Sequence, residues 1–194
     1  MRFSGKYWDD KYLRKSTGWD IGYVSTPLKE YFDQLSDKNI KILIPGAGRA
    51  WEAEYLHLDG FNNVTILDYS SEAINEFTNR CPDFPKEKIV IEDFFHHSSK
   101  YDLIVEQTFF SSLKPGQRQD YAKHVDKLLK NGGKLVGLLF NHRFEFDGPP
   151  FGGTENEYLR LFSEDFIIQK MEIAYNSINP RKGRELFMLL QKRN

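Results

Sequence analysis

The sequence predicts an α/β fold: a seven-stranded, mainly parallel sheet, with its last strand antiparallel and helices on both faces. Three observations support this expectation. From residue 40 onward, short apolar segments alternate with helix-like segments; a Pro-Gly turn follows the first apolar segment; and two strand-like segments close the chain around residues 179–183. In such sheets, ligands bind beyond the carboxyl ends of the strands.

The individual elements follow from local patterns. Strands are expected over residues 40–44, 63–67, 88–91, 101–106, 134–140, 166–175 and 185–191. Helices are expected over residues 8–14, 26–35, 49–58, 117–130 and 155–162. One further helix is expected to begin after Ser70 or Ser71, either of which can cap it. Residues 131–133, Asn-Gly-Gly, are expected to end the helix over 117–130, and residues 141–154 are expected to form a loop.

Composition limits the possible partners. The 194 residues carry a net charge of −1, which argues against a nucleic-acid or membrane-surface partner. The single Cys81 argues against a disulfide framework and a Cys-based zinc site. Adjacent His96 and His97 point to opposite faces of an extended segment, so no metal site is expected. With no signal-peptide pattern and no membrane-length apolar run, we expect one monomeric, cytoplasmic domain over residues 1–194.

A glycine loop after the first strand indicates a nucleoside site. Gly46 and Gly48 allow a ligand to approach the backbone where a helix begins, and the helix N-terminus offers free N–H groups. Asp68, at the end of the second strand, is placed to accept both hydroxyls of a ribose. Asp93 and Phe94 follow the third strand, where they can bind the amino group of an adenine and pack on its face.

Two cofactor classes use a glycine loop of this kind. Dinucleotide enzymes need a third small residue beside the pyrophosphate, and the aligned position here is Trp51. The indole favours S-adenosylmethionine (SAM), a nucleoside without phosphate. A nicotinamide-dependent oxidoreductase remains one alternative, and a SAM-binding protein without catalysis is another.

Together these segments resemble the SAM-dependent methyltransferases of the thiopurine S-methyltransferase superfamily, especially its halide/thiocyanate (thiol) methyltransferases. The resemblance lies in residues 8–12 (WDDKY), 17–28, 45–48 (PGAG), 67–70 (LDYS), 93–94, 106–110 (EQTFF), 128–133 (LLKNGG), 148–151 (GPPF) and 181–185 (RKGRE). It implies the class I methyltransferase (Rossmann-like) fold, with residues 1–36 as a helical, aromatic lid and residues 141–165 as a substrate-side loop and helix.

The resemblance also implies cofactor contacts at Trp8, Tyr12, Trp19, Gly46, Asp68, Asp93, Phe94 and Gln107, and the glycine loop itself adds Gly48. Aromatic faces stabilise cations by about 0.5–2 kcal/mol each, so the first three suit a sulfonium. The sequence departs from the family at Tyr12, where Trp is frequent, and at Glu106-Gln107, where the halide enzymes carry Asp-Tyr.

The expected reaction moves the methyl group of SAM to a small thiol or soft anion, which leaves S-adenosylhomocysteine. The acceptors considered are a thiolate, hydrosulfide, thiocyanate, a halide and a thiopurine. No catalytic residue is assigned. Candidates on the acceptor side are Gln107, His142, Phe146, Phe151 and Arg181, with Arg184 as a second cation.

Overall fold

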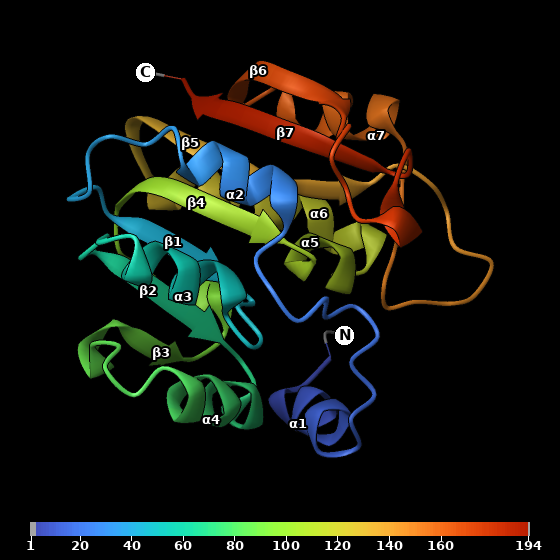
Figure 1. Ribbon diagram of the computed structural model, residues 1–194. Helices are drawn as coiled ribbons and strands as arrows, with labels where there is room; N and C mark the ends of the chain where they lie inside the picture. Colours follow the sequence, from blue (N-terminus) through green and yellow to red (C-terminus); the bar gives the residue numbers. More distant parts are fainter. Residues whose placement is uncertain (1–2, 194) are drawn as a thin grey trace.

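The computed structural model describes residues 3–193 and contains one seven-stranded sheet (Figure 1). The strand order is β3-β2-β1-β4-β5-β7-β6. The strands are β1 (Ile42–Pro45), β2 (Val64–Asp68), β3 (Ile89–Ile91), β4 (Tyr101–Gln107), β5 (Leu129–Phe140), β6 (Phe166–Ile173) and β7 (Glu185–Lys192). The pairs β1–β2, β1–β4, β2–β3 and β4–β5 are parallel, whereas β7 is antiparallel to both neighbours. The predicted sheet, with its last strand reversed, is confirmed.

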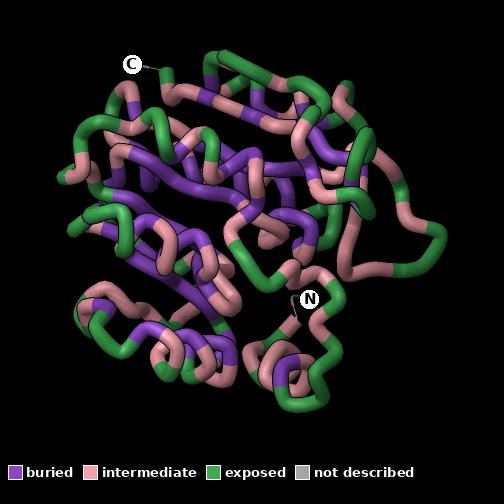
Figure 2. Tube along the Cα trace, in the orientation of Figure 1, coloured by how far each residue is buried: buried purple, intermediate pink, exposed green. Residues whose placement is uncertain are grey.

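Seven α-helices accompany the sheet within residues 3–193. They are α1 (Gly5–Leu13), α2 (Thr26–Phe32), α3 (Trp51–Leu58), α4 (Ser71–Arg80), α5 (Phe109–Ser112), α6 (Arg118–Leu128) and α7 (Glu155–Phe162). Four 3₁₀ helices are η1 (Lys86–Lys88), η2 (Phe94–His96), η3 (Pro115–Gln117) and η4 (Asn179–Arg181). Apolar side chains of α2, α3 and α4 cover one face of the sheet, and those of α5, α6 and α7 cover the other. Figure 2 shows the resulting burial along the central strands.

The junction between α6 and β5 differs from the prediction. The helix ends at Leu128 and the strand begins at Leu129, so the expected helix to residue 130 and strand start at 134 are wrong. Leu129 pairs with Tyr101 on β4, and the register then shifts before Lys134 pairs with Leu103. Gly132, at φ +73°, provides the left-handed residue within this irregular part of the strand.

Helix α1 lies beside α4 at the carboxyl edge of the parallel strands (Figure 1). The Asp9 carboxylate accepts hydrogen bonds from the Ser70 hydroxyl (2.6 Å) and from the Glu72 backbone N–H (3.1 Å). Helix α2 behaves differently, because Leu28 and Phe32 are fully buried against the sheet. The part of the N-terminus that reaches the cavity described below is therefore residues 3–23, which we call the N-terminal segment; residues 1–2 of the expected lid lie outside the described chain.

A buried carboxyl group joins β4 to the two helices that follow it. Glu106 is fully buried and accepts hydrogen bonds from the Phe110 N–H (2.8 Å) and the Tyr121 hydroxyl (2.7 Å). Burial raises the pKa of Glu106 to about 7, although both hydrogen bonds oppose the rise.

Within residues 3–193, no helix is both long and apolar enough to cross a membrane.

We expect Glu106 to make the protein less stable as pH rises. Its native pKa of about 7 lies above its ordinary value of 4.5, so between these values the native state binds more protons than the unfolded state. The favourable contribution of the protonated Glu106 carboxyl group to the free energy of unfolding is complete below pH 4.5 and is lost as the pH rises through about 7. Glu106→Gln should therefore flatten the pH dependence of the free energy of unfolding by about 1–3 kcal/mol.

Urea unfolding at pH 5, 6, 7 and 8 measures this difference. Glu145→Gln, in an exposed loop, is the matched control and should follow the wild type. Parallel pH profiles for Glu106→Gln and the wild type would contradict the prediction.

Candidate cofactor and acceptor site

An open cavity of about 880 Å³ lies at the carboxyl ends of β1, β2 and β4, next to α1. Seven of the nine predicted cofactor residues line it: Trp8, Tyr12, Trp19, Gly46, Asp68, Asp93 and Phe94. The other two, Gly48 and Gln107, line a second cavity of about 400 Å³. Both cavities share Tyr12, Trp19, Gly46 and Thr108, so they adjoin each other.

The glycine loop connects β1 to α3 in a conformation that larger residues resist. Gly46 and Gly48 have φ values of +57° and +55°. A Cβ atom on Gly46 would overlap the ring of Phe109, and one on Gly48 would lie 2.7 Å from the Tyr12 hydroxyl. Gly46 therefore lets the backbone line both cavities, and Gly48 lets it line the second one.

Asp68 holds the end of β2 against this loop. Its Oδ2 accepts a hydrogen bond from the Gly48 N–H (2.7 Å), and its Oδ1 accepts one from the Ser70 N–H (2.8 Å). Burial raises the pKa of Asp68, while the N–H groups of Ser70, Gly48 and Tyr69 oppose the rise. Each carboxylate oxygen has a further lone pair, so Asp68 can still accept hydroxyl donors from a ligand.

The residues after β3 form another part of the wall. Asp93 caps η2 by accepting a hydrogen bond from the Phe95 N–H (3.0 Å), and the Tyr69 hydroxyl lies 3.3 Å from its Oδ2. Phe94 is 1% exposed and packs edge-to-face on Phe109 at 5.2 Å between ring centres. Phe94 therefore supports the cavity wall mainly as a core residue.

Three aromatic residues of the N-terminal segment gather over the cavity. Trp19 contacts Trp8 and Tyr12 edge-to-face, with ring centres 5.6 Å and 6.0 Å apart. Tyr12 is buried, and burial raises the pKa of its hydroxyl, so it remains neutral at physiological pH. The group presents aromatic surface to the cavity, as a sulfonium cation requires.

Hydrogen bonds that the sequence analysis did not identify fasten this segment to the glycine loop. Arg49 donates to the Asp20 carboxylate (2.5 Å) and to the Thr17 hydroxyl (3.0 Å), and it also pairs with Glu76. The Trp51 indole N–H donates to the same Asp20 (2.9 Å). The available signal was an arginine directly after the glycine loop, but a single charge does not identify its partner.

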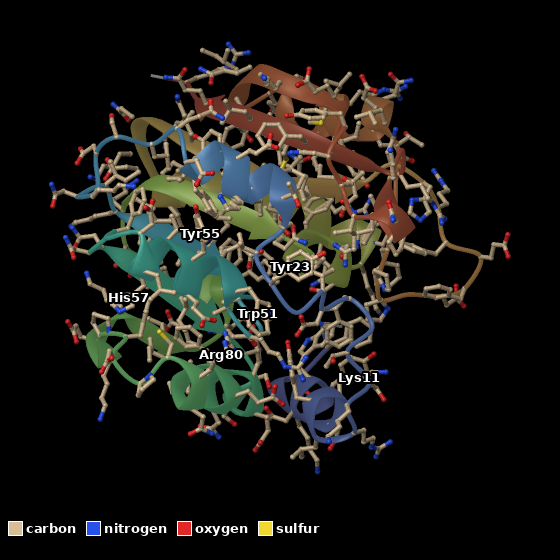
Figure 3. The ribbon with its side chains drawn as sticks, in the orientation of Figure 1. Lys11, Tyr23, Trp51, Tyr55, His57 and Arg80 are labelled. Carbon is tan, nitrogen blue, oxygen red and sulfur yellow. The ribbon has the colours of Figure 1, made fainter. Side chains whose placement is uncertain are left out.

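The Trp51 indole also lies against the Arg80 guanidinium, whose carbon is 3.7 Å from the ring centre (Figure 3). Arg80 in turn donates to the Glu54 carboxylate (2.5 Å) and to the Arg49 carbonyl. Trp51 therefore packs between the N-terminal segment and α4.

The acceptor-side candidates are dispersed. Gln107 lines the second cavity, and its Oε1 is buried without a hydrogen-bond partner within residues 3–193. His142 packs between Phe140 and Phe144 and lines neither cavity. Phe146 is 56% exposed and also lines neither one.

Phe151 and Arg181 form hydrogen bonds with the backbone of other segments. The Phe151 N–H donates to the Ser111 carbonyl (2.6 Å), while its neighbours Pro149 and Pro150 line the first cavity. Arg181 is buried, pairs with Glu185 (3.2 Å) and donates to the Trp19 carbonyl (2.6 Å). Arg184 is exposed. Within residues 3–193, no group of three or more His, Cys, Asp and Glu residues is arranged to hold a metal ion.

The charge of the first cavity is one-sided. Three acids line it, Asp68, Glu92 and Asp93, and no Lys, Arg or His among the described residues does so. Such a wall disfavours a pyrophosphate and suits a cationic nucleoside. The strand order, the glycine loop, the acid at the end of β2 and this cavity define a class I SAM-dependent methyltransferase.

The chain belongs to the thiopurine S-methyltransferase (TPMT) family, which matches residues 4–190. A probable thiol methyltransferase 2 of Arabidopsis thaliana is 31% identical, over 92% of this chain and 81% of that protein. A thiocyanate methyltransferase 1 of Brassica oleracea is 28% identical, over 93% and 80%. A thiopurine S-methyltransferase of Aliivibrio fischeri is 24% identical, over 81% and 82%.

Solved structures show the same fold. The 1,6-didemethyltoxoflavin-N1-methyltransferase of Burkholderia thailandensis, with bound S-adenosylhomocysteine, superposes with a TM-score of 0.76 at 17% identity, covering 98% of this chain and 87% of that one. The magnesium protoporphyrin IX methyltransferase of Synechocystis PCC 6803, with bound SAM, gives a TM-score of 0.75 at 11% identity, over 99% and 98%. Together with the family match and the named relatives, this makes the protein a methyltransferase that uses SAM.

Replacing Asp68 tests the predicted ribose contact. Asp68→Ala should weaken binding of S-adenosylhomocysteine about 10–100-fold, because hydrogen bonds to a charged group contribute about 1.5–3 kcal/mol each. Calorimetry measures the dissociation constant, and a thermal melt checks that the fold persists. Asp59→Ala, remote from both cavities, is the control. An unchanged dissociation constant for Asp68→Ala would show that Asp68 serves only the glycine loop.

Replacing Trp19 tests the predicted lid. Trp19→Ala should lose SAM affinity and leave the N-terminal segment open to trypsin at Lys11, Arg14 and Lys15 even with ligand present. In the wild type, SAM should protect these sites, because the ring contacts and the ligand stabilise the same arrangement. Leu13→Ala, at an exposed position, is the control. If SAM gives the wild type no protection, the lid prediction is wrong.

Proposed function

We propose that the enzyme methylates the sulfur of a small thiol, hydrosulfide or thiocyanate, and that the first cavity binds the adenosine part of SAM. In this proposal Asp68 binds the ribose and Asp93 binds the adenine amino group. Three relatives are named for thiol, thiocyanate and thiopurine acceptors, which have sulfur in common. A halide is less favoured, because Gln107 stands where the halide enzymes carry Tyr.

The lack of a suitable base at the first cavity is the observation that carries the proposal. No Lys, His or Cys among the described residues lines it, and its three acids have other roles: in this proposal Asp68 and Asp93 bind the nucleoside, and Glu92 pairs with His97. Transfer to an alcohol or amine usually requires proton removal by a positioned base. A thiolate or thiocyanate arrives already anionic and needs none.

A buried cation supports an anionic acceptor near residues 148–152. Arg118 is 8% exposed and donates to the carbonyls of Phe151 and Gly152 (both 3.0 Å). Within residues 3–193 it forms no ion pair with a carboxylate, and its Nε lacks a hydrogen-bond partner. Arg181, the cation expected from the sequence, is instead neutralised by Glu185. Arg118 thus supplies positive potential next to Pro149 and Pro150, which line the first cavity.

Bound SAM would supply a methyl group on a cationic sulfur: as the acceptor sulfur bonded to that carbon, the bond from the carbon to the sulfonium sulfur would break, leaving S-adenosylhomocysteine and the methylated acceptor. The residues of this chain orient the partners and exclude water. Trp8, Tyr12 and Trp19 cover the cavity, and its largely aromatic surface lowers the cost of removing water from a soft anion.

Headspace analysis of methylated products tests the acceptor class. With a thiol of ordinary pKa, the rate should rise about tenfold per pH unit below that pKa, because only the ionised fraction reacts. With thiocyanate, which is anionic throughout, this dependence should be absent. Transfer only to a catechol, an amine or a nucleobase would refute the proposal, and SAM binding without methylation of any thiol or anion would favour a non-catalytic protein.

A further inference from the structure

The connection between β6 and β7 lies beside the N-terminal segment. Figure 1 shows the turn that carries η4 next to the chain between α1 and α2. A third cavity, of about 790 Å³, is lined by residues 18, 20, 21 and 23 on one side and by residues 178–181 on the other. It shares Asp20, Ile21 and Tyr23 with the second cavity, so these three residues lie between the two.

Residues 18–23 are held from two sides. On one side, the glycine loop and α3 donate hydrogen bonds to the Asp20 carboxylate. On the other side, the Nη2 of Arg181, in η4, donates to the Trp19 carbonyl at 2.6 Å, across 162 residues of sequence. Trp19 contacts both other rings of the aromatic group over the first cavity, so Arg181 holds the backbone beneath the shared member of that group.

Arg181 is itself fixed by buried partners. Its Nη1 lies 3.2 Å from the Glu185 carboxylate, which also accepts a hydrogen bond from the Ser177 hydroxyl (2.8 Å). Arg181 is 8% exposed and Glu185 is 3% exposed. The N–H groups of a guanidinium point in fixed directions, so an Arg181 side chain that is anchored on β7 sets the position of the Trp19 backbone.

The same contacts argue against Arg181 as a cation for the acceptor. Glu185 neutralises its charge, and Arg181 lines neither the first nor the second cavity. Asp20 lines the third cavity with it, and Glu52, a buried acid in the first turn of α3, interacts with its charge. An anionic acceptor would therefore meet no net positive charge at Arg181.

We propose that Arg181 is a positioning residue for the cofactor: through the Trp19 carbonyl it holds the N-terminal segment over the first cavity, and it does not contact the acceptor. The inference rests on the predicted contact between Trp19 and SAM. A segment that is already held in place costs the ligand less ordering free energy when it binds. Cofactor affinity therefore depends on a residue that lies outside the cofactor cavity.

Arg181→Lys tests this role. A lysine can still pair with Glu185, but it lacks the rigid fork that spans both the carboxylate and the Trp19 carbonyl. By calorimetry without acceptor, Arg181→Lys should bind S-adenosylhomocysteine about tenfold more weakly than the wild type, the loss expected for one hydrogen bond from a charged donor. Lys182→Gln, at an exposed position in the same turn, is the control and should bind it as the wild type does.

A second variant avoids an unpaired buried charge. Arg181→Met combined with Glu185→Gln removes both charges and the donor to Trp19, while the amide can still accept from Ser177. It should lose affinity for S-adenosylhomocysteine to the same extent, and it serves if Arg181→Lys does not fold. A thermal melt checks the fold of each variant.

A double-mutant cycle separates positioning from general support of the structure. Trp19→Ala keeps the carbonyl but removes the ring that the carbonyl positions. In the Trp19→Ala background, Arg181→Lys should therefore weaken S-adenosylhomocysteine less than twofold further. A tenfold loss in both backgrounds would overturn the inference, because Arg181 would then act independently of Trp19.

The acceptor gives an independent readout. With SAM saturating, the KM for whichever of thiocyanate and hydrosulfide the wild type methylates faster should stay within twofold in both Arg181 variants. A tenfold rise in this KM with unchanged affinity for S-adenosylhomocysteine would overturn the inference and return Arg181 to the acceptor side.

The remaining outcomes separate this inference from the lid prediction. If Trp19→Ala weakened S-adenosylhomocysteine but neither Arg181 variant did, the inference would be wrong and the lid prediction would stand. If Trp19→Ala bound S-adenosylhomocysteine as tightly as the wild type, the lid prediction would be wrong, and the role of Arg181 would fall with it.

Discussion

The carboxylate of Asp68 connects parts of the chain that are distant in sequence. It accepts backbone hydrogen bonds from Gly48, in the loop after β1, and from Ser70, before α4. The Ser70 hydroxyl in turn bonds Asp9 of α1. Because hydrogen bonds to an ionised group are strong, this one side chain fixes the positions of the glycine loop and the end of β2. Through Ser70 it also fixes the position of the N-terminal segment. A ligand that contacts Asp68 touches the group on which the shape of the cavity depends.

Charge is distributed unevenly around the two cavities. Acids line the side assigned to the cofactor, including Asp68 and Asp93 in the first cavity and Glu52 in the second. The buried cation Arg118 lies instead beside the carbonyls of residues 151 and 152, next to the prolines of the first cavity. A cationic methyl donor and an anionic acceptor would therefore be attracted to opposite sides, which orients them before they meet.

Local patterns in the sequence were sufficient for the strands, most helices and the glycine loop, because these depend on periodicity and short-range backbone needs. The site was predictable only in part, and the roles of its residues remain predictions. Arg49 and Asp20 meet across irregular segments 29 residues apart in sequence, which no periodicity reveals. An acid such as Glu52 in a first helical turn is ordinarily exposed, and only the tertiary structure buries it. His142 and Phe146 were expected near the ligand, but the aromatic residues of that loop pack on one another instead.

The attachment of the N-terminal segment by Asp9 and Asp20 bears on the kinetics of turnover. If the N-terminal segment covers bound cofactor, as the lid prediction has it, these hydrogen bonds open and close whenever product is exchanged for new cofactor. If that opening is slower than methyl transfer, acceptors of very different nucleophilicity share one maximal velocity. They then differ only in the concentration at which they reach it.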